Sequence, residues 1–416
     1  MRALVLHPDI RTEPARREPA AALDEAVSLA VALPGLDVVG AEVVRLPRAQ
    51  PGTLFGSGKI EEIGQRLKAD EIGLVLIDGP VTPVQQRNLE REWKVKLLDR
   101  TSLILEIFAD RARTREGALQ VEMAALSYQR TRLVRAWTHL ERQRGGLGFV
   151  GGPGETQIEA DRRAIDDQLV RLRKQLSKVV KTRALHRAAR AKVPYPVVAL
   201  VGYTNAGKST LFNRLTGAEV LAKDMLFATL DPTMRAVRLS TGRDVILSDT
   251  VGFISDLPTQ LVAAFRATLE EVLAADVIVH VRDIAHAETD LQAEDVETVL
   301  AELGVAEDTP KIELWNKVDL LDPEARAAVE ARAARTEGVF TGSALTGEGL
   351  PALLEAVTEA LDEARVTETI VVPFAAGRQR AWLYEQGVVE DEAQTDAGHR
   401  LTVHWTPRQR AAYLRL

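Results

Sequence analysis

The chain contains no cysteine among its 416 residues. This absence excludes disulfide scaffolds, cysteine zinc sites, iron–sulfur clusters and thiol nucleophiles. Aromatic residues make up only 5% of the sequence. No apolar run approaches a length of about 18 residues, which would indicate a transmembrane helix. The N-terminal stretch reaches charge and proline before the apolar core of a signal peptide can form. We therefore expect a cytoplasmic protein without a membrane span.

The length indicates two or three domains, at roughly 150 residues per domain. Hydrophobic residues at 46% and charged residues at 27% are typical of a globular protein. Strand and helix patterns alternate along most of the chain, which predicts the α/β class. We expect an N-terminal α/β domain over 1–112, a helical hairpin over 113–192, a larger α/β domain over 193–365 and a short α+β tail over 366–416.

The N-terminal region shows short apolar runs that predict strands at 2–8, 37–47, 72–79 and 95–100. Helical patterns lie between them at 20–33, 59–70 and 83–92. The GSGK tetrapeptide at 56–59 lacks the earlier glycine of a phosphate loop, so we interpret it as a turn and helix start. No catalytic constellation is evident in this region.

Two long helices are predicted by leucine spacing. Leucine recurs every seven residues from Leu119 to Leu140, and an apolar seam with steps of four and three runs from Ile165 to Val179. The pair can form an antiparallel hairpin. The tip at 143–156 is rich in glycine, with six glycines between 145 and 154, and we interpret it as a loop that orders against a partner.

Charge is unevenly distributed along the chain. The net charge of the whole protein is −7, whereas residues 111–192 carry 19 Lys or Arg and 8 Asp or Glu. The hairpin therefore has a net charge of +11, and the remainder carries −18. A basic segment on an acidic body is typical of a protein that places one element against a polyanion.

A phosphate-binding loop follows the apolar strand at 197–201. Its pattern is Gly202-x-x-x-x-Gly207-Lys208-Ser209, and an amphipathic helix comes next. Backbone N–H groups of such a loop point at phosphate oxygens, Lys208 reaches the β- and γ-phosphates, and the Ser209 hydroxyl binds Mg²⁺. The predicted nucleotide contacts here are Gly202, Tyr203, Thr204, Asn205, Ala206, Gly207, Lys208, Ser209 and Thr210.

The choice of base is predicted from a motif at the end of the strand at 311–316. Asn316-Lys317-Val318-Asp319 places a carboxylate where it can accept from both N1–H and the 2-amino group of guanine. Adenine lacks that amino group and presents an acceptor at N1, so a buried Asp319 would be left unpaired and the site rejects adenine. Asn316 would contact the other edge of guanine or buttress the phosphate loop. Ser343, Ala344 and Leu345 would complete the guanine pocket.

Two further loops are predicted to sense the γ-phosphate. Asp249, Thr250, Val251 and Gly252 end another strand, where Asp249 can hold Mg²⁺ through water and the Gly252 N–H can bond the phosphate. The segment before that strand offers Thr229 as the Mg²⁺ ligand, with Thr233 as the rival. Lys208, Thr229 and Gly252 are the candidate catalytic residues. This segment contributes Phe227, Ala228, Thr229, Leu230 and Asp231 to the predicted GTP contacts.

Five motifs resemble the HflX family of ribosome-associated GTPases. They are GYTNAGKSTLFN at 202–213, LFATLDPT at 226–233, DTVGFI at 249–254, GPGETQIEADRR at 152–163 and FGSGKIEEI at 55–63. The resemblance implies a P-loop GTPase that uses GTP and Mg²⁺ and binds the large ribosomal subunit. It further implies splitting or rescue of stalled ribosomes under stress, with the hairpin tip near the peptidyl transferase centre.

The chain departs from the family pattern at two places. Val150-Gly151-Gly152-Pro153 stands where the family carries an arginine before its Gly-Pro-Gly, and Arg282 interrupts a strand that is usually apolar.

Phe253 occupies the position of the water-orienting glutamine of many GTPases, and a phenyl ring cannot orient water. We therefore expect slow intrinsic hydrolysis that a partner accelerates. Asn205 resembles an asparagine that holds K⁺ in related GTPases; a plain loop hydrogen bond is the alternative.

Two functional interpretations remain open from the sequence. In the first, GTP hydrolysis times the release of a ribosome-bound factor. In the second, GTP mainly stabilises a docked conformation, as in a ribosome or ribonucleoprotein assembly factor. A membrane-acting GTPase is disfavoured because there is no lipidation motif or apolar anchor. We expect a monomer.

Overall fold

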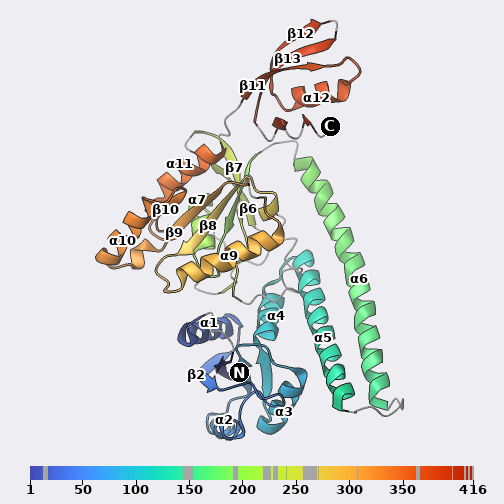
Figure 1. Cartoon of the computed structure of the whole chain (residues 1–416), viewed down its shortest axis with the longest axis vertical. Helices are drawn as coiled ribbons and strands as arrows, with labels where there is room; N and C mark the ends of the chain where they lie inside the picture. Colours follow the sequence, from blue (N-terminus) through green and yellow to red (C-terminus); the bar gives the residue numbers. More distant parts are fainter. Residues whose placement is uncertain are drawn as a thin grey trace. The chain divides into compact units, whose positions relative to one another are not determined.

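The protein was analysed as a computed structural model, shown in Figure 1. The structure describes residues 1–12, 17–143, 153–190, 195–218, 226–227, 233–239, 241–255, 269, 271–306, 308–361, 366–395, 397–406, 409–410 and 413–414. Packing divides the chain into two units, of which the larger comprises 1–238 with 244–350 and the smaller 239–243 with 351–416. None of the described helices is both long and apolar enough to cross a bilayer.

The N-terminal region is a parallel sheet in the order β2-β1-β3-β4. Its strands are β1 (Arg2–Ile10), β2 (Asp37–Leu46), β3 (Leu74–Ile77) and β4 (Lys96–Asp99). Alternate residues of β1 enter two cores, since Ala3 and Val5 pack with one cluster and Leu4 and Leu6 with the other. A sheet buried on both faces needs near-continuous apolar strands, which explains the short apolar runs of the sequence.

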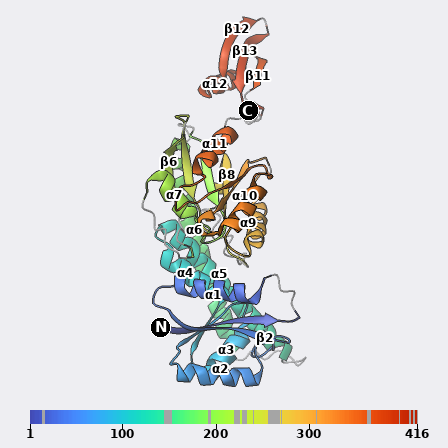
Figure 2. The ribbon, with the colours of Figure 1, turned by 90° about the vertical axis from the view of Figure 1, so that its left-hand side faces the viewer.

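Helices cover both faces of this sheet, as Figure 2 shows. They are α1 (Pro19–Ala32), α2 (Ser57–Ala69), α3 (Pro83–Trp93) and α4 (Arg100–Arg111). Gly56 is the N-cap of α2, which confirms the interpretation of the GSGK segment. No helix was predicted from the sequence at the position of α4. It begins directly after β4, where the Asp99 carboxylate accepts from the Ser102 N–H at 2.9 Å, so no loop marks its start.

The predicted hairpin consists of α5 (Arg115–Gln143) and α6 (Pro153–Arg190), which pack side by side (Figure 1). Leu119, Leu169 and Leu172 are buried, and the Arg130 Nε forms an ion pair with the Asp166 carboxylate at 2.6 Å. The prediction of a tip loop over 143–156 was too long, because α6 already begins at Pro153. Proline is favoured in the first turn of a helix, where its missing N–H costs nothing. The remaining tip residues, 144–152, lie outside the described ranges.

The central sheet has the order β10-β9-β8-β5-β7-β6. Five strands are parallel and were expected: β5 (Val197–Val201), β7 (Asp244–Asp249), β8 (Val277–Asp283), β9 (Lys311–Asn316) and β10 (Val339–Thr341). The edge strand β6 (Thr233–Arg238) was missed and runs antiparallel to β7. Its residues are mostly half-exposed or exposed, so the sequence lacks the apolar run that marked its neighbours. The other elements that the structure describes in this region are α7 (Lys208–Thr216), α9 (Thr289–Leu303), α10 (Pro323–Ala333) and the 3₁₀ turn η1 (Val318–Leu320).

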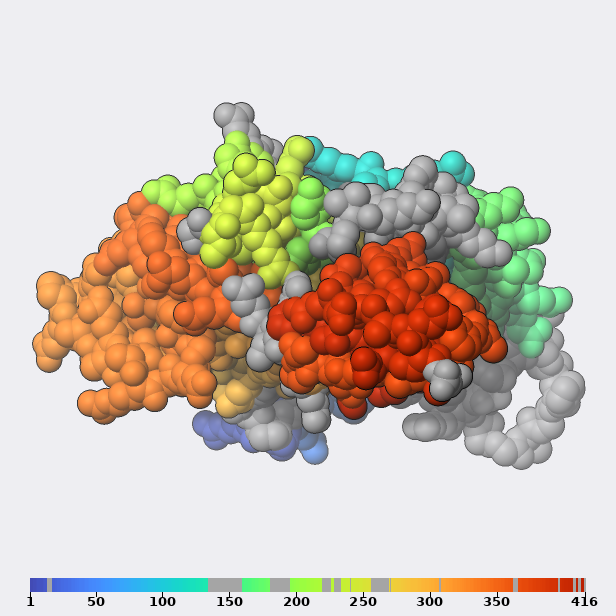
Figure 3. Space-filling model, turned by 90° about the horizontal axis from the view of Figure 1, so that it is seen from above, coloured from blue at the N-terminus to red at the C-terminus, as the bar shows by residue number. Residues whose placement is uncertain are grey.

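The smaller unit contains α11 (Leu350–Leu361, from its second residue), followed by an antiparallel sheet in the order β11-β13-β12. The strands are β11 (Val366–Val372), β12 (Val389–Thr395) and β13 (Gly398–Trp405), with α12 (Gly377–Glu385) between the first two. The atoms from β11 to β13 form one compact body, red in Figure 3. β12 was not predicted, because its acidic sequence VEDEAQT lacks apolar alternation. The observed fold otherwise confirms the expected class, an α/β P-loop domain with an α/β region before it and an α+β tail.

Candidate nucleotide-binding site

The loop between β5 and α7 has a backbone that only certain residues can adopt. Gly202 and Gly207 have φ values of 148° and 98°. A Cβ on Gly202 would lie 2.2 Å from the Val281 carbonyl oxygen, and one on Gly207 would lie 2.2 Å from the Asn316 side-chain nitrogen. Asn205, at φ 60°, is of a residue type that tolerates the left-handed region. The glycine spacing of the motif is therefore required by close approaches as well as by turn geometry.

Lys208 is a buried cation at the start of α7. Its Nζ donates to the carbonyl oxygens of Gly202 at 3.0 Å and Tyr203 at 2.7 Å. Burial lowers the pKa of Lys208 to about 8, and the Asp249 carboxylate only partly opposes this effect. A buried ammonium that is costly to keep charged fits a site whose ligand is an anion.

The predicted Mg²⁺ side brings Ser209 and Asp249 together. The Ser209 hydroxyl donates to the Asp249 Oδ2 at 2.7 Å, and Asp249 is fully buried at the end of β7. Thr233 begins β6 directly opposite Asp249 in the ladder. Thr229, with Ala228, Leu230 and Asp231, lies outside the described residues. Within those residues no group of three or more His, Asp or Glu side chains forms a metal cage, so Mg²⁺ here would depend on nucleotide oxygens and water.

The segment after β7 is bonded to the phosphate loop. The Thr204 N–H donates to the Phe253 carbonyl at 2.7 Å, and the Phe253 N–H donates to the Gly202 carbonyl at 3.1 Å. A Cβ on Gly252 would lie 2.9 Å from the Thr204 Cα and 3.0 Å from the Lys208 Nζ. Gly252 thus sits where a γ-phosphate held by Lys208 would meet it.

Two side chains, one in this segment and one in the phosphate loop, bear on the chemistry. The Phe253 ring is 1% exposed within a hydrophobic core, so it cannot turn toward the phosphates. The Thr204 hydroxyl is buried and has no hydrogen-bond partner among the described residues. A buried orphan hydroxyl next to Gly252 and Lys208 is the feature expected where a phosphate oxygen or its water would bind.

The predicted base side contains Asn316, Lys317 and Asp319. The Asn316 amide donates to the Ala206 carbonyl at 2.7 Å and accepts from the Ala344 N–H at 2.8 Å. Asn316 was expected either to contact guanine or to buttress the phosphate loop, and these two hydrogen bonds show that it buttresses the loop. Lys317 has φ 69° and donates to Asp283 at 2.7 Å. Asp319 is exposed, contrary to the buried carboxylate expected, so a bound base would have to bury it.

The loop after β10 lies against this edge. Ser343 is fully buried, and its hydroxyl accepts from the Thr346 N–H at 3.1 Å. Leu345 is 69% exposed at the rim. The structure therefore brings the predicted residues 343–345 beside Asn316, as a guanine pocket requires.

Arg282, which interrupts the apolar strand β8, has charged and aromatic partners. Its guanidinium donates to Glu313 at 2.9 Å and to Asp290, and it lies 5.5 Å from the centre of the Trp315 ring. The Trp315 indole N–H donates to the same Glu313 carboxylate at 2.8 Å. These contacts brace the end of β9 immediately before Asn316. The sequence offered no signal for them, because the partners lie on separate strands and a helix.

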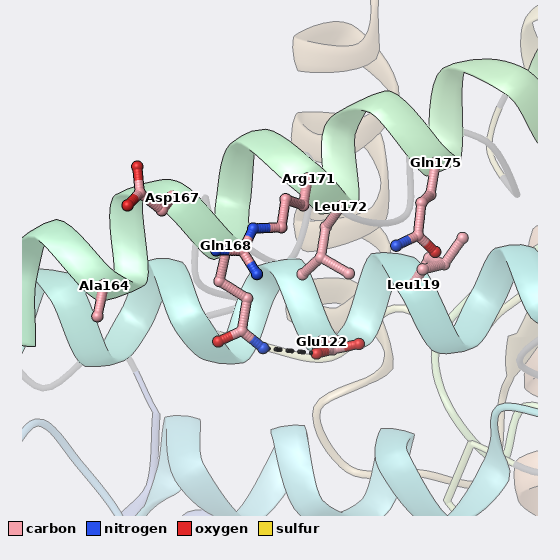
Figure 4. Close-up of a pocket in the computed structure, with 8 residues that line it drawn as sticks. All are labelled: Leu119, Glu122, Ala164, Asp167, Gln168, Arg171, Leu172 and Gln175. Atoms are coloured by element: carbon pink, nitrogen blue, oxygen red, sulfur yellow. Dashed lines mark hydrogen bonds between the residues drawn. The ribbon is translucent and has the colours of Figure 1, made fainter.

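A cavity of about 650 Å³ lies between α5 and α6 (Figure 4). Leu119 and Leu172 line it together with charged and amide side chains, and Gln168 donates to Glu122 at 3.0 Å. None of the predicted nucleotide contacts lines this cavity. It is a feature of the hairpin and separate from the phosphate loop.

Comparisons with known proteins cover nearly the whole chain. Family models match at 20–109 (GTP-binding GTPase N-terminal), 111–190 (GTP-binding GTPase Middle Region), 197–317 (50S ribosome-binding GTPase) and 328–415 (HflX C-terminal domain). GTPase HflX of Magnetococcus marinus is 50% identical over 385 residues, which cover 92% of this chain and 88% of the relative. GTPase HflX of Escherichia coli is 46% identical over 348 residues, covering 84% and 81%. With a P-loop geometry and relatives of this similarity, the chain is a GTP-binding GTPase that belongs to the HflX family.

Proposed function

We propose that this GTPase binds the large ribosomal subunit through the α5–α6 hairpin and splits or rescues stalled ribosomes under stress. The family model named for 50S ribosome binding supports the partner, as do relatives called GTPase HflX. The domain division at 112, 192 and 365, a cytoplasmic location and a monomeric state belong to the same proposal.

The observation that carries the proposal is the charge of α6. Between residues 168 and 192 the chain has nine Lys or Arg and no Asp or Glu. Arg171, Arg173, Lys174 and Lys178 are exposed, while the apolar seam that includes Leu169 and Leu172 faces inward. A one-signed, exposed helix face gives the electrostatic footprint of phosphate-backbone binding.

The nucleotide chemistry follows from the side chains around the phosphate loop. Lys208 binds the β- and γ-phosphates, and the Gly252 N–H bonds the γ-phosphate. Ser209 and Thr229 would hold Mg²⁺, which neutralises charge that develops on the phosphate oxygens. Asp319 selects guanine by accepting from its N1–H and 2-amino groups.

Phe253 makes intrinsic hydrolysis slow, because its buried ring cannot orient the attacking water. The ribosome would then complete the site and accelerate turnover. K⁺ held by Asn205 would supply part of the missing charge stabilisation. Equal turnover with and without large subunits would contradict the first point, and equal rates in NaCl and KCl would contradict the second.

The same buried phenyl ring favours a second candidate function, an assembly factor for which GTP is mainly a conformational ligand. The two differ in their response to a non-hydrolysable GTP analogue. A hydrolysis timer acts once and then fails to recycle, whereas an assembly module works as well with the analogue as with GTP.

Sedimentation with purified large subunits tests the proposal. We expect co-sedimentation with the GTP analogue, weaker binding with GDP, and loss of binding when 143–156 is replaced by a short turn. Changing Arg171, Arg173, Lys174 and Lys178 to Gln should weaken binding and lower the salt slope by about three, at roughly 0.7 to 0.9 per phosphate contact.

The matched control changes four exposed basic residues of the N-terminal region, Arg87, Arg91, Lys94 and Lys96, to Gln. This control removes the same number of positive charges from another part of the protein and should leave co-sedimentation with the large subunit unchanged. Binding that is insensitive to nucleotide, to tip replacement and to the α6 variant would overturn the ribosome proposal.

A further inference from the structure

A buried cluster of charged and hydroxyl side chains joins the N-terminal region to the nucleotide site. We call it the boundary cluster. Its members are Arg17, Glu25, Asp78 and Arg100 from the N-terminal region, and Tyr203, Ser255 and Glu288 from the GTPase region.

Glu25 of α1 is at the centre of the boundary cluster. One carboxylate oxygen accepts from Arg100 and from the Ser255 hydroxyl, the latter at 2.9 Å. The other accepts from the Tyr203 hydroxyl and from Arg17, the latter at 2.9 Å. The Glu25 side chain is only 8% exposed. Burial alone would raise the pKa of Glu25, but the Arg100 and Arg17 guanidiniums outweigh burial and hold that pKa below its usual range.

The GTPase residues that Glu25 contacts belong to the phosphate machinery. Tyr203 is the second residue of the phosphate loop and forms a strand-like bridge with Phe253. Ser255 lies two residues beyond Phe253, and its N–H donates to the Tyr203 hydroxyl at 2.8 Å. Arg100 also donates to the Ser255 carbonyl at 3.1 Å. The cluster therefore holds both loops at the points that flank Gly252.

The remaining contacts anchor the cluster to the rest of the protein. Arg100 donates to Asp78 at 2.6 Å at the end of β3, and Arg17 donates to Glu288 at 2.8 Å just before α9. Buried charges of this kind persist only with their partners in place, because a charge that loses its partner in the interior is strongly destabilising. A shift of Ser255 would break its bonds to Tyr203, Glu25 and Arg100 together.

We infer that Glu25, Arg100 and Tyr203 are positioning residues for GTP hydrolysis. They hold the 252–255 segment closed on the phosphate loop, so that the Gly252 N–H meets the γ-phosphate. This closed arrangement is the one observed, with Gly252 beside the Lys208 Nζ. The N-terminal region thereby supplies part of the nucleotide site, independently of whether the hairpin binds ribosomes.

The test compares Glu25→Gln and Tyr203→Phe with the wild-type full-length protein. Glu25→Gln keeps the shape and removes the charge, whereas Tyr203→Phe removes one hydroxyl and leaves every ion pair intact. We expect kcat to fall about tenfold for Glu25→Gln and about threefold for Tyr203→Phe, with a smaller rise in KM. Affinity for a non-hydrolysable GTP analogue should fall relative to GDP, because only the triphosphate uses Gly252.

Glu42→Gln is the control, since it breaks the more exposed Lys59–Glu42 pair in the same region and should leave these ratios unchanged. Thermal melting with GDP checks that each variant is folded. The double variant should lose no more than Glu25→Gln alone, because both changes break the same link. Wild-type turnover and a wild-type analogue-to-GDP ratio in folded Tyr203→Phe and Glu25→Gln would overturn the inference, as would faster hydrolysis in either.

Discussion

In two sheets of the molecule, the parallel strands end at carboxyl edges that differ in how a buried charge is paired. At the edge of the N-terminal sheet, Asp99 is 1% exposed and accepts from Ser102, Tyr128 and Arg132. At the edge of the central sheet, the buried cation Lys208 donates to two carbonyl oxygens and forms no ion pair within the described part of the chain. Ligands of parallel α/β sheets bind at such edges. The comparison teaches that an edge becomes a ligand site where the protein leaves a charge for the ligand to neutralise.

We expect the largest effect from a substitution that removes the charge of Lys208. Lys208→Ala should weaken GTP binding about a thousandfold, which corresponds to about 4 kcal/mol for a buried charge pair. Equilibrium titration with a fluorescent GTP analogue measures the loss. Retained affinity would show that Lys208 is not the cation of the site, and the contrast between the two edges would fail.

Asp319→Asn tests the base side of the same edge. The amide would present a donor to the donor groups of guanine, so GTP affinity should fall at least about a hundredfold. Binding of xanthosine triphosphate, which has an acceptor in place of the 2-amino group, should improve. Competition between the two nucleotides reads out the change, and an unaltered preference would place guanine recognition elsewhere.

Arg132→Ala probes the edge where the charges are paired. Removing a partner of the buried Asp99 should lower the free energy of unfolding by about 2 kcal/mol and leave nucleotide affinity unchanged. Urea denaturation and GTP titration are measured on the same preparation. A loss of GTP affinity without a loss of stability would mean that this edge too serves a ligand.

Gly252→Ala should have a smaller effect that is selective for the triphosphate. The added methyl would crowd the Thr204 backbone and the Lys208 ammonium, which should cost about tenfold in affinity for a GTP analogue. GDP affinity should change less. Gly56→Ala is the matched control, because a Cβ there meets nothing within 4 Å.

The smallest effect is on pH dependence, and the two edges should respond in opposite directions. Because Lys208 has a pKa of about 8 in the free protein, GTP affinity should fall up to about eightfold as pH rises from 7.5 to about 9. Lys208→Arg, which stays protonated, should flatten that slope. The folded-state pKa of Lys208 is below its unfolded value, so its contribution to stability rises as pH rises through this range.

The carboxylates at the edge of the N-terminal sheet should make stability depend on pH in the acid range. Burial alone would raise the pKa of Asp78, but the bonds from His7 and Arg100 outweigh burial and lower it. A depressed folded-state pKa adds stability above the unfolded value near 4, and this stability is lost as pH falls through the folded value. Melting temperatures of Asp78→Asn and wild type should therefore converge at low pH.

The parts of the site that lie close together along the chain were predicted well. The glycines and Lys208 of the phosphate loop follow one another within a single turn, so their spacing already encodes the backbone curl. The motifs at Asp249 and Asn316 were placed because each ends an apolar strand, and parallel strands bring such ends to one edge. Asp319 was expected in a buried position and is exposed.

The elements that escaped prediction share a lack of local signal. β6 and β12 carry polar or charged residues on exposed edges, and α4 follows its strand without a turn. Arg282 interrupts an apolar strand, and only the structure shows Glu313 and Trp315 beside it. Secondary-structure propensity and hydrophobic periodicity depend on the residues of a single segment. They therefore miss segments whose structure is determined by contacts with neighbouring elements.

By itself, the sequence determined the nucleotide, the order of the nucleotide-binding motifs and the separation of a basic hairpin from an acidic body, because these depend on residue type and spacing. Only the tertiary structure decided that Asn316 braces the phosphate loop and that Glu25 meets Ser255, 230 residues away. The physical reason is that a buried ion pair is specified by mutual placement in a low-dielectric interior. Neither partner carries a pattern in its own segment that names the other.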